Sequence, residues 1–366
     1  MRLLFVSTHT DQHTGYSRVS NSLLKELVKV EGLEVFHFGF QRHPVFRREK
    51  IKGLTQYDAQ ANEDPKQQGF GFNCFLDYAK LVKPDVVMIY NDTMIINQFL
   101  AIMPEQRDYK IWVYLDQVYK GCGLGKIKEM ADKVFVFAKE WKLHDVENQF
   151  ILHHAPDSSI KPLDKEIVDK QKEMMKITGK TIFLNVNRNS QRKRLDLTIQ
   201  AFKKYLEHDP DSHLIIATTS SGEYNIPNIV NIEEVPVDKV TFIDTEKQPL
   251  TDDQMNMLYN VADYGLNTAN GEGWGLSTMD HAYLGKPQLV LDLGAYRSFL
   301  DEKSSVFVKP TLRNHIQNVG FGYFSESTTP ELIAEGMKLL PAKEKPSIEL
   351  TWQSVTEELR GMLKTS

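Results

Sequence analysis

The sequence predicts an α/β protein of two domains, each built on a parallel sheet that is covered by helices. Three observations support this class. The chain has 366 residues, which is long for a single hydrophobic core. Short runs rich in Val, Ile and Leu alternate with segments of helical period in both halves. These runs are apolar on both faces, as strands are in a sheet with helices on either side.

The N-terminal domain is predicted to span residues 1–155. Residues 2–7 form the first predicted strand, a polar loop follows, and residues 19–30 have helical period. Gly15 therefore lies where the first strand-to-helix loop meets its helix. The further strands predicted in this domain are residues 33–38, 85–90, 110–115 and 133–137.

Residues 39–71 have no clear period, and a long irregular segment inside a compact domain is usually functional or mobile. This segment carries a basic cluster beside Phe46. Two interpretations stay open: a solvated face, or contact with an acceptor or an anionic surface, which includes peripheral contact with a membrane. The cluster consists of Arg42, His43, Arg47, Arg48, Lys50 and Lys52.

The C-terminal domain is predicted to span residues 156–346, after a linker at residues 155–157. The alternation of strands and helices begins again here, without sequence repetition. A last helix within residues 347–366 follows two prolines and is expected to cross back to the first domain. The strands predicted are residues 181–187, 214–218, 264–267 and 288–291, and the helices are residues 195–206, 251–261 and 331–340.

Composition excludes several classes of protein. Hydrophobic residues make up 41% and charged residues 25%, as in soluble globular proteins. The net charge of −5 argues against a general nucleic-acid binder. Cys74 and Cys122 show no metal-ligand spacing, so we expect a reducing compartment and no zinc site. The apolar run at residues 3–6 is too short for a signal peptide and no stretch has transmembrane length, so a cytoplasmic protein is expected.

Residues 270–292 contain a loop that is suited to ligand contact. Three glycines surround Glu272, so another molecule can approach the main chain closely. The predicted helix that follows offers free N–H groups and a partial positive charge to an anion. For Glu272, ligand contact is favoured over a solvated turn. Asp280 has two interpretations: contact with a ligand across the helix start, or a capping box with Ser277.

A second loop, at residues 188–194, carries four cations between a predicted strand and a predicted helix. Loops of this kind emerge at the carboxyl edge of a parallel sheet, so this loop and the Glu272 loop are expected to share one crevice. Cations, glycines and a helix N-terminus together suit a diphosphate. We expect Arg188 and Lys193 to contact the ligand, and Arg192 and Arg194 to be solvated.

The two loops resemble the signatures of the retaining family 4 glycosyltransferases, which are of the glycosyl transferases group 1 type. Residues 188–196 resemble Gly-Arg-Leu-x-x-x-Lys-Gly-x-Asp, and residues 272–287 resemble Glu-Gly-Phe-Gly-Leu-x-x-x-Glu-Ala-x-x-x-Gly-x-Pro. Residues 131–136 are similar to the family's Ala-Asp-x-Val stretch. The resemblance implies the GT-B fold: two Rossmann-like domains that face a central cleft, with a C-terminal helix crossing back to the N-terminal domain.

The resemblance also implies an enzyme of glycan biosynthesis that moves a sugar from a nucleotide-diphosphate sugar to a hydroxyl acceptor, such as a glycan, a glycoconjugate or a small molecule. At matched positions, Arg188 and Lys193 hold the leaving diphosphate and Glu272 holds the donor sugar. No cofactor is implied, because the nucleotide sugar is a substrate. The implied donor-binding residues are Gly15, Asp116, Gly273, Gly275, Leu276, Ser277 and, at the ribose, Asp280.

The chain departs from the family pattern at several positions, four of which concern the expected site. Asn187 and Arg194 replace the usual glycines, and Asp280 replaces a glutamate. Leu115 stands, next to Asp116, where many members have a histidine that contacts the 6-hydroxyl of the sugar. A leucine cannot make that hydrogen bond, so a donor without a 6-hydroxyl, such as a deoxyhexose or a pentose, is expected over a hexose.

Glycosyl transfer develops negative charge on the departing diphosphate, which the loop cations can stabilise. No cluster of carboxylates suggests a catalytic metal, so metal independence is expected. The alternatives are a non-catalytic protein that binds a sugar or nucleotide, and an epimerase or phosphorylase on the same fold. The sequence leaves open the donor base, the sugar, the acceptor, the oligomeric state, and whether retention proceeds by front-face attack or a covalent intermediate.

Overall fold

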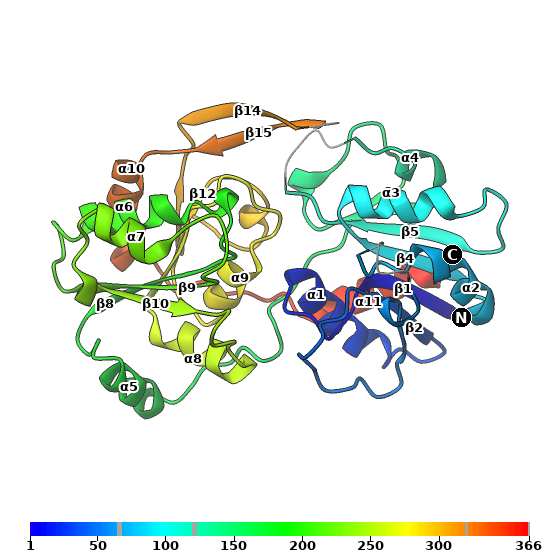
Figure 1. Ribbon diagram of the computed structural model, residues 1–366, viewed down its shortest axis with the longest axis horizontal. Helices are drawn as coiled ribbons and strands as arrows, with labels where there is room; N and C mark the ends of the chain where they lie inside the picture. Colours follow the sequence, from blue (N-terminus) through cyan, green and yellow to red (C-terminus); the bar gives the residue numbers. More distant parts are fainter. Residues whose placement is uncertain (64–67, 119–122, 319–320, 365–366) are drawn as a thin grey trace. The chain divides into compact units, whose positions relative to one another are not determined.

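The computed structural model describes residues 1–63, 68–118, 123–318 and 321–364. Cys122 lies outside these residues. The chain folds as two compact units, which are shown in Figure 1. The first unit comprises Met1–Ala155 and Leu350–Ser366, and the second comprises Pro156–Glu349.

The first unit is built on a seven-stranded sheet in which neighbouring strands are parallel. Its strands are β1 (Arg2–Thr8), β2 (Glu34–Phe40), β3 (Thr55–Asp58), β4 (Val86–Asn91), β5 (Lys110–Leu115), β6 (Lys133–Val136) and β7 (Gln149–Ile151). Their order across the sheet is β3-β2-β1-β4-β5-β6-β7. The helices are α1 (Gly15–Leu27), α2 (Phe72–Val82), α3 (Thr93–Ile102), α4 (Ile127–Met130) and α11 (Trp352–Leu363).

The second unit has a six-stranded parallel sheet with strands β8 (Thr181–Val186), β9 (Ser212–Thr218), β10 (Val240–Asp244), β11 (Tyr264–Asn267), β12 (Gln288–Leu291) and β13 (Ser305–Val308). Their order is β10-β9-β8-β11-β12-β13, which repeats the pattern of the first sheet. An antiparallel ribbon of β14 (Leu312–Asn318) and β15 (Phe321–Ser327) stands apart from this sheet (Figure 1). The helices are α5 (Lys165–Met174), α6 (Leu195–Tyr205), α7 (Ile226–Ile232), α8 (Asp252–Val261), α9 (Leu276–Tyr283) and α10 (Pro330–Leu339).

Single turns of 3₁₀-helix connect some of these elements. They are η1 (Gln60–Asn62), η3 (Lys139–Trp141), η4 (Gln191–Lys193), η5 (Val237–Lys239), η6 (Tyr296–Ser298) and η7 (Leu340–Ala342). Both sheets have the strand order of the Rossmann fold, in which ligands bind at the carboxyl ends of the strands. The predicted α/β class with two Rossmann-like domains is confirmed.

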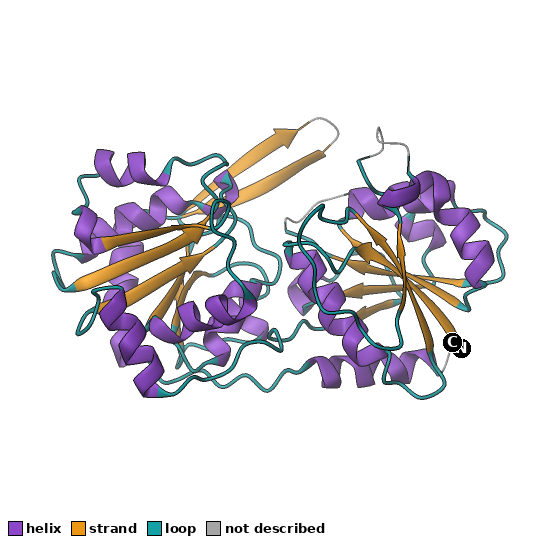
Figure 2. Ribbon diagram, turned by 60° about the horizontal axis from the view of Figure 1, so that its bottom comes forward, coloured by secondary structure: helices purple, strands orange, loops and turns teal. Residues whose placement is uncertain are grey.

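Helices lie on both faces of each sheet, as Figure 2 shows. Central strands are therefore buried on both sides: all six residues of β4 are buried. The helices are amphipathic, and α1 buries Val19, Leu23, Leu24 and Leu27. Each of these side chains contributes about 1.5 to 3 kcal/mol by leaving water. Among the described residues, no helix combines the length and the apolar content that spanning a membrane requires.

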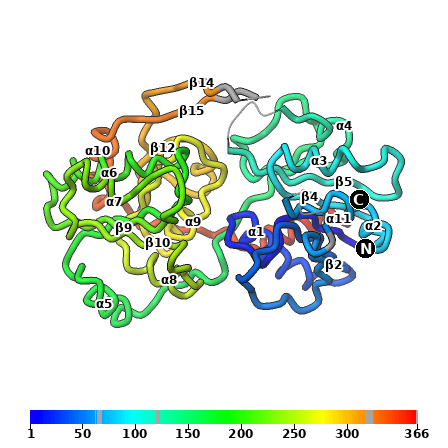
Figure 3. The backbone as a smooth tube through the Cα atoms, viewed as in Figure 1, coloured from blue at the N-terminus to red at the C-terminus, as the bar shows by residue number. Residues whose placement is uncertain are grey.

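The C-terminal helix α11 belongs to the first unit, as the resemblance implies. It begins after Thr351, whose side chain caps the helix. The Nζ of Lys133 donates to the carbonyl of Met362 at 3.2 Å, and the rings of His154 and Trp352 are 6.0 Å apart. In Figure 3 the red trace of this helix lies among the blue and cyan segments of the first unit.

Several elements were not predicted. β3 lies at the edge of the first sheet within the segment that we expected to be irregular, and its four residues are exposed or half-buried. β10 is the edge strand of the second sheet and is half-buried throughout. Edge strands of this kind lack the continuous apolar run of a central strand. The hydrophobic pattern therefore gives no signal for them.

Candidate functional site

The loop between β11 and α9, residues 268–275, is called the glycine loop here and packs closely against residues 294–296. Gly275 has φ 89°, and a Cβ there would lie 2.5 Å from the ring of Tyr296. Gly294 has φ 65°, and a Cβ there would overlap the carbonyl oxygen of Glu272. Both positions therefore require glycine. Helix α9 begins after Gly275 without a side-chain cap, so Leu276 and Ser277 lie in a first turn whose N–H groups no cap occupies.

The basic loop between β8 and α6 contains the turn η4. Arg194, directly after this turn, has φ 46° and ψ 49°, in the left-handed region. Glycine adopts this conformation readily, which explains why the resembled signature has a glycine here. In this chain Arg194 is held by Asp196, at 3.0 Å, and by the Oγ of Ser327, at 2.9 Å.

The structure brings the basic loop and the glycine loop together, as predicted from the strand pattern. The N–H of Asn270 donates to the carbonyl of Arg192 at 2.9 Å. The hydroxyl of Thr268 donates to the carbonyl of Arg194 at 2.8 Å. The Nζ of Lys193 forms an ion pair with Oε2 of Glu272. Two loops far apart in the sequence thus form one site at the carboxyl edge of the second sheet.

Glu272 is 7% exposed and lies between cations. Its Oε1 is 3.6 Å from the Nη1 of Arg192, and the amide of Asn267 donates to its Oε2 at 3.4 Å. Burial raises the pKa of Glu272, but Lys193 and Arg192 outweigh burial and leave this pKa below its ordinary value. Burial lowers the pKa of Lys193 by more than Glu272 raises it. Glu272 is therefore a buried, ionised hydrogen-bond acceptor.

Arg188 is the exposed cation of this site. In the part of the chain that the structure describes, its guanidinium has no ion pair or hydrogen bond, whereas Lys193 is buried against Glu272. Burial and the charge of Arg192 lower the pKa of Lys193, and the charge of Arg188 adds to this lowering. Arg188 is thus available to an anion without losing an internal partner.

Metal ligands do not gather at this site. Within residues 1–63, 68–118, 123–318 and 321–364, no three His, Cys, Asp or Glu side chains form a group that could hold a metal ion. The charges of the site come from Arg188, Arg192, Lys193 and Glu272. Together with the open start of α9, they form an arrangement suited to a phosphate group beside a hydrogen-bonding carboxylate.

Asp280 is buried, and its environment differs from the capping interpretation. The residue that precedes α9 is Gly275, so a capping box of Ser277 with Asp280 is wrong. Asp280 is 1% exposed, and its Oδ1 accepts a hydrogen bond from the N–H of Asp157 at 3.0 Å. It therefore fastens the start of the second unit to α9. Its contact with a ribose stays a prediction.

Two predicted donor-binding residues lie in the first unit. Gly15 is the first residue of α1, where the side chain of Thr14 accepts from the N–H of Ser17 at 3.2 Å. Asp116 follows β5 and accepts a hydrogen bond from the hydroxyl of Tyr90 at 3.4 Å. Both lie at the carboxyl edge of the first sheet, and their roles stay predictions.

Leu115 is buried in the first sheet, so the structure gives no support to the expectation built on it. Its side chain is 0% exposed. It is the last paired residue of β5, opposite Asn91 on one side and Val136 on the other. The strand pairing therefore places its side chain in the core. The preference for a donor without a 6-hydroxyl loses its basis.

Three residues of the site were missed by the sequence analysis. Arg192 was expected to be solvated, but it contacts Gly271 and Glu272. Asn267 ends β11, and an asparagine at a strand end beside a glycine loop is a signal that was available. The ring of Tyr296 lies beneath Gly275 and its hydroxyl is buried. Nothing in the sequence marks this tyrosine.

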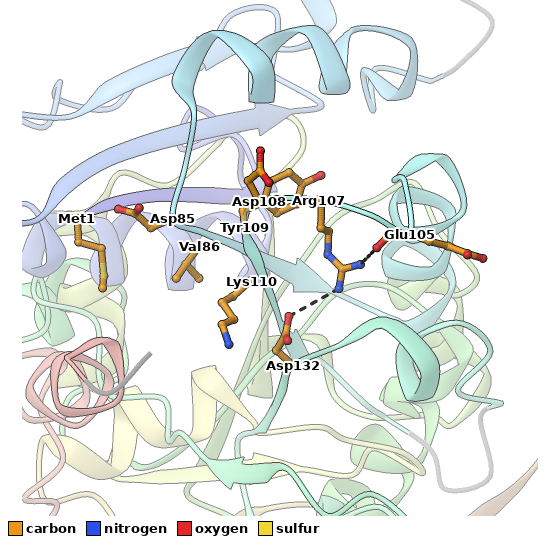
Figure 4. A pocket seen from close by; sticks show the side chains of 9 residues that line it. All are labelled: Met1, Asp85, Val86, Glu105, Arg107, Asp108, Tyr109, Lys110 and Asp132. Atoms are coloured by element: carbon orange, nitrogen blue, oxygen red, sulfur yellow. Dashed lines mark hydrogen bonds and ion pairs between the residues drawn. The ribbon is translucent and has the colours of Figure 1, made fainter.

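A hollow of about 540 Å³ lies elsewhere, at the amino edge of the first sheet. Two of its carboxylates accept hydrogen bonds from N–H groups at the starts of strands. Asp85 accepts from the N–H of Arg2, and Asp132 from the N–H of Ile111, both at 2.7 Å. Figure 4 shows Arg107 directed toward Asp132, at 3.7 Å. This hollow lies at the opposite edge of the first sheet from Gly15 and Asp116, and none of the predicted site residues lines it.

Solved structures resemble the whole chain. Sucrose-phosphate synthase from Thermosynechococcus elongatus has a TM-score of 0.75 at 14% identity, over 100% of this chain and 98% of that one. HepE from Anabaena, in complex with UDP-glucose, has a TM-score of 0.69 at 11% identity over 100% of both chains. A glycosyltransferase from Rickettsia africae has a TM-score of 0.67 at 13% identity, over 100% and 93%. No curated protein matches the sequence.

These likenesses define the class: the chain has the GT-B fold of two Rossmann-like domains. Residues 167–345 match the family model described as glycosyl transferases group 1. The matched residues lie within the second unit and include both the basic loop and the glycine loop.

Proposed function

We propose that the protein is a retaining, metal-independent glycosyltransferase that moves a sugar from a nucleotide-diphosphate sugar to a hydroxyl acceptor. One observation carries the proposal. A buried, ionised Glu272 lies against Lys193 and Arg192, beside the uncapped start of α9, within a glycosyl transferases group 1 domain. A carboxylate next to an anion-binding edge suits a ligand that has both hydroxyls and a diphosphate.

Each group has a distinct part in the proposed reaction. Arg188, Lys193 and the N–H groups of Leu276 and Ser277 stabilise the diphosphate as the bond between it and the anomeric carbon breaks. Glu272 accepts hydrogen bonds from the sugar. The acceptor oxygen bonds to the anomeric carbon, and its proton ends on the diphosphate in front-face attack. Fixed cations at such a site contribute on the order of 10²- to 10³-fold each, because they need no reorganisation during the reaction.

The partners of the reaction are a nucleotide sugar and a hydroxyl acceptor. HepE, which is similar in fold, is in complex with UDP-glucose, so UDP sugars are the first donors to test. The exposed Lys50 and Lys52 of the basic cluster leave an anionic acceptor or peripheral membrane contact open to test. A cytoplasmic location remains our expectation.

Product analysis tests the proposal and separates it from its rivals. The protein is incubated with UDP-, GDP-, ADP- and dTDP-sugars, with a panel of hydroxyl acceptors or with inorganic phosphate, and products are identified by mass spectrometry and NMR. We expect a glycosylated acceptor with the anomeric configuration of the donor. An epimerised donor or a sugar phosphate indicates the other enzyme classes. Binding without any product indicates a non-catalytic protein.

Activity is expected to survive an excess of EDTA. The diphosphate charge is met in this proposal by Arg188, Lys193 and the start of α9, so no divalent cation is needed. Initial rates are compared before and after chelation, and again with added Mg²⁺ or Mn²⁺. A loss of activity on chelation that either cation restores would contradict metal independence.

A further inference from the structure

Arg192 makes contacts that set it apart from the other cations of the basic loop. Its carbonyl accepts from the N–H of Asn270 at 2.9 Å. Its Nη1 donates to the carbonyl of Gly271 and lies 3.6 Å from Oε1 of Glu272. Three consecutive residues of the glycine loop are thus held by one arginine.

We propose that Arg192 is a positioning residue that fixes the Glu272 carboxylate for the donor sugar, while Arg188 meets the diphosphate. This inference rests on the proposed function and deepens it. It assigns different parts of the nucleotide sugar to two arginines of the same loop. It also replaces the expectation that Arg192 is solvated.

The Glu272 carboxylate is held through both of its oxygens. Lys193 and Asn267 contact Oε2, and Arg192 is near Oε1. The last torsion of a glutamate side chain is soft, so two-sided contact is needed to keep one orientation. Removal of Arg192 leaves Oε1 without its cation. The carboxylate can then rotate about its contacts with Lys193 and Asn267.

The loop backbone is held in two places, and only one depends on Arg192. At Gly273, the carbonyl accepts from the N–H of Ala295 at 3.0 Å, and the ring of Tyr296 packs beneath Gly275. At residues 270–272, Arg192 contacts all three residues, while the N–H of Glu326 also donates to the carbonyl of Asn270 at 3.3 Å and Lys193 pairs with Glu272. Loss of Arg192 therefore loosens the part of the loop that carries Glu272 and leaves the start of α9 supported.

Arg188 offers the matched comparison within the same loop. It is exposed and, among the described residues, its guanidinium has no partner, whereas the Arg192 side chain is 27% exposed and engaged. A ligand can recruit Arg188 without breaking an internal contact. Recruiting Arg192 would cost its contacts with Gly271 and Glu272. The geometry therefore assigns Arg188 to the diphosphate and Arg192, through Glu272, to recognition of the sugar.

The experiment compares binding of UDP with binding of UDP-glucose by calorimetry, in wild type and variants. We expect Arg192→Ala to weaken UDP-glucose at least tenfold while UDP changes less than threefold. Arg188→Ala is expected to weaken both ligands alike. Arg192→Lys keeps a charge near Oε1 and should recover part of the UDP-glucose affinity. Arg313→Ala, which removes an exposed arginine of the ribbon paired with Glu326, is the control and should change neither.

A pH series gives a second readout that a merely structural role would not move. The groups that face Glu272 are Lys193, Arg192, Asn267 and Tyr296. Because Arg192 helps to lower the pKa of Glu272, Arg192→Ala should move the acid loss of UDP-glucose binding to higher pH. The same shift should be absent in Arg188→Ala.

The outcomes separate failure of this inference from failure of the proposed function. If Arg192→Ala weakens UDP and UDP-glucose equally, Arg192 contacts the diphosphate and the inference is wrong. If neither affinity changes, Arg192 has no positioning role. If Arg192→Ala does not fold, the affinities for UDP and UDP-glucose are compared in Arg192→Lys, and the same criteria apply to their ratio. If wild type binds neither UDP nor UDP-glucose, the series is repeated with the GDP, ADP and dTDP pairs. Failure of all four pairs contradicts the proposed function itself.

Discussion

The two units share one strand order but use the carboxyl edges of their sheets differently. Each edge holds a buried carboxylate beside arginines: Asp11 in the first unit, with a side chain 10% exposed, and Glu272 in the second, 9% exposed. The N–H of Arg48 donates to Asp11 at 3.0 Å, and the Nε of Arg42 at 3.1 Å. The two edges thus look alike at the level of a single carboxylate.

The two edges differ in the cations and N–H groups that are left for contact with a ligand. In the first unit, the guanidinium of Arg48 donates to the carbonyl of Thr10 and to Ser17, both at 2.7 Å, so it fastens the loop after β1. The side chain of Thr14 also caps α1. In the second unit Arg188 is exposed and α9 has no side-chain cap. A shared strand order therefore does not by itself show where an anion binds. The cations and N–H groups without internal partners indicate the anion site.

The largest expected effect comes from breaking the buried pair of the second unit. Lys193→Ala should lower kcat on the order of 10²- to 10³-fold. It should also lower the free energy of unfolding by about 3 to 5 kcal/mol, because Glu272 loses its closest cation in the interior. Denaturation of Lys193→Met, Glu272→Gln and the double variant measures the pair, and additive losses would contradict a coupled pair.

Removal of the exposed cation should weaken the ligand site without lowering the stability of the fold. Arg188→Ala is expected to weaken UDP, or whichever nucleoside diphosphate binds, about 10- to 100-fold, the range for hydrogen bonds to charged groups. The melting temperature should stay close to that of wild type, because the side chain has no internal partner in the described structure. Lys52→Ala, an exposed lysine of the first unit, is the control. Equal effects of the two variants would refute the contrast between the edges.

Acid should destabilise both units through buried histidines. Burial lowers the pKa of His37 in the first unit and of His281 in the second to about 3. Unfolded histidine binds a proton below about pH 6.5, so stability falls from there toward pH 3 by about 1.4 kcal/mol per pH unit for each histidine. Calorimetry of His37→Gln and His281→Gln across this pH range should show that the free energy of unfolding of each variant falls less steeply with acid than that of wild type. An unchanged slope in both would contradict buried neutral histidines.

The smallest predicted effect concerns the turn that presents Lys193. Arg194 has φ 46°, which a residue other than glycine adopts at a cost. Arg194→Gly should therefore be more stable than Arg194→Ala by about 1 kcal/mol, since both lose the contact with Asp196 and only glycine relieves the strain. Thermal denaturation of both variants measures this. A more stable alanine variant would show that the left-handed turn is not retained.

The sequence predicted the parts of the fold and site that depend on strong local patterns. β4 and β5 are apolar on both faces, and the Lys193 and Glu272 loops follow strands, so their shared edge was predictable. Edge strands such as β3 gave no signal because they are half-buried and polar. The direction of a side chain depends on register and turn conformation. For this reason the contact of Arg192 with Glu272 could not be predicted, whereas the burial of Leu115 follows from its place in the predicted strand at residues 110–115.

Equilibrium binding of nucleoside diphosphates tests the central claim, that the carboxyl edge of the second unit holds the donor, most directly. Wild type, Arg188→Ala and Arg188→Ala/Lys193→Met are titrated with UDP, GDP, ADP and dTDP in the presence of EDTA. We predict that wild type binds at least one of the four, that Arg188→Ala binds it about 10- to 100-fold more weakly, and that the double variant binds it more weakly still. Absence of binding by wild type, or equal affinity in all three proteins, would contradict the claim.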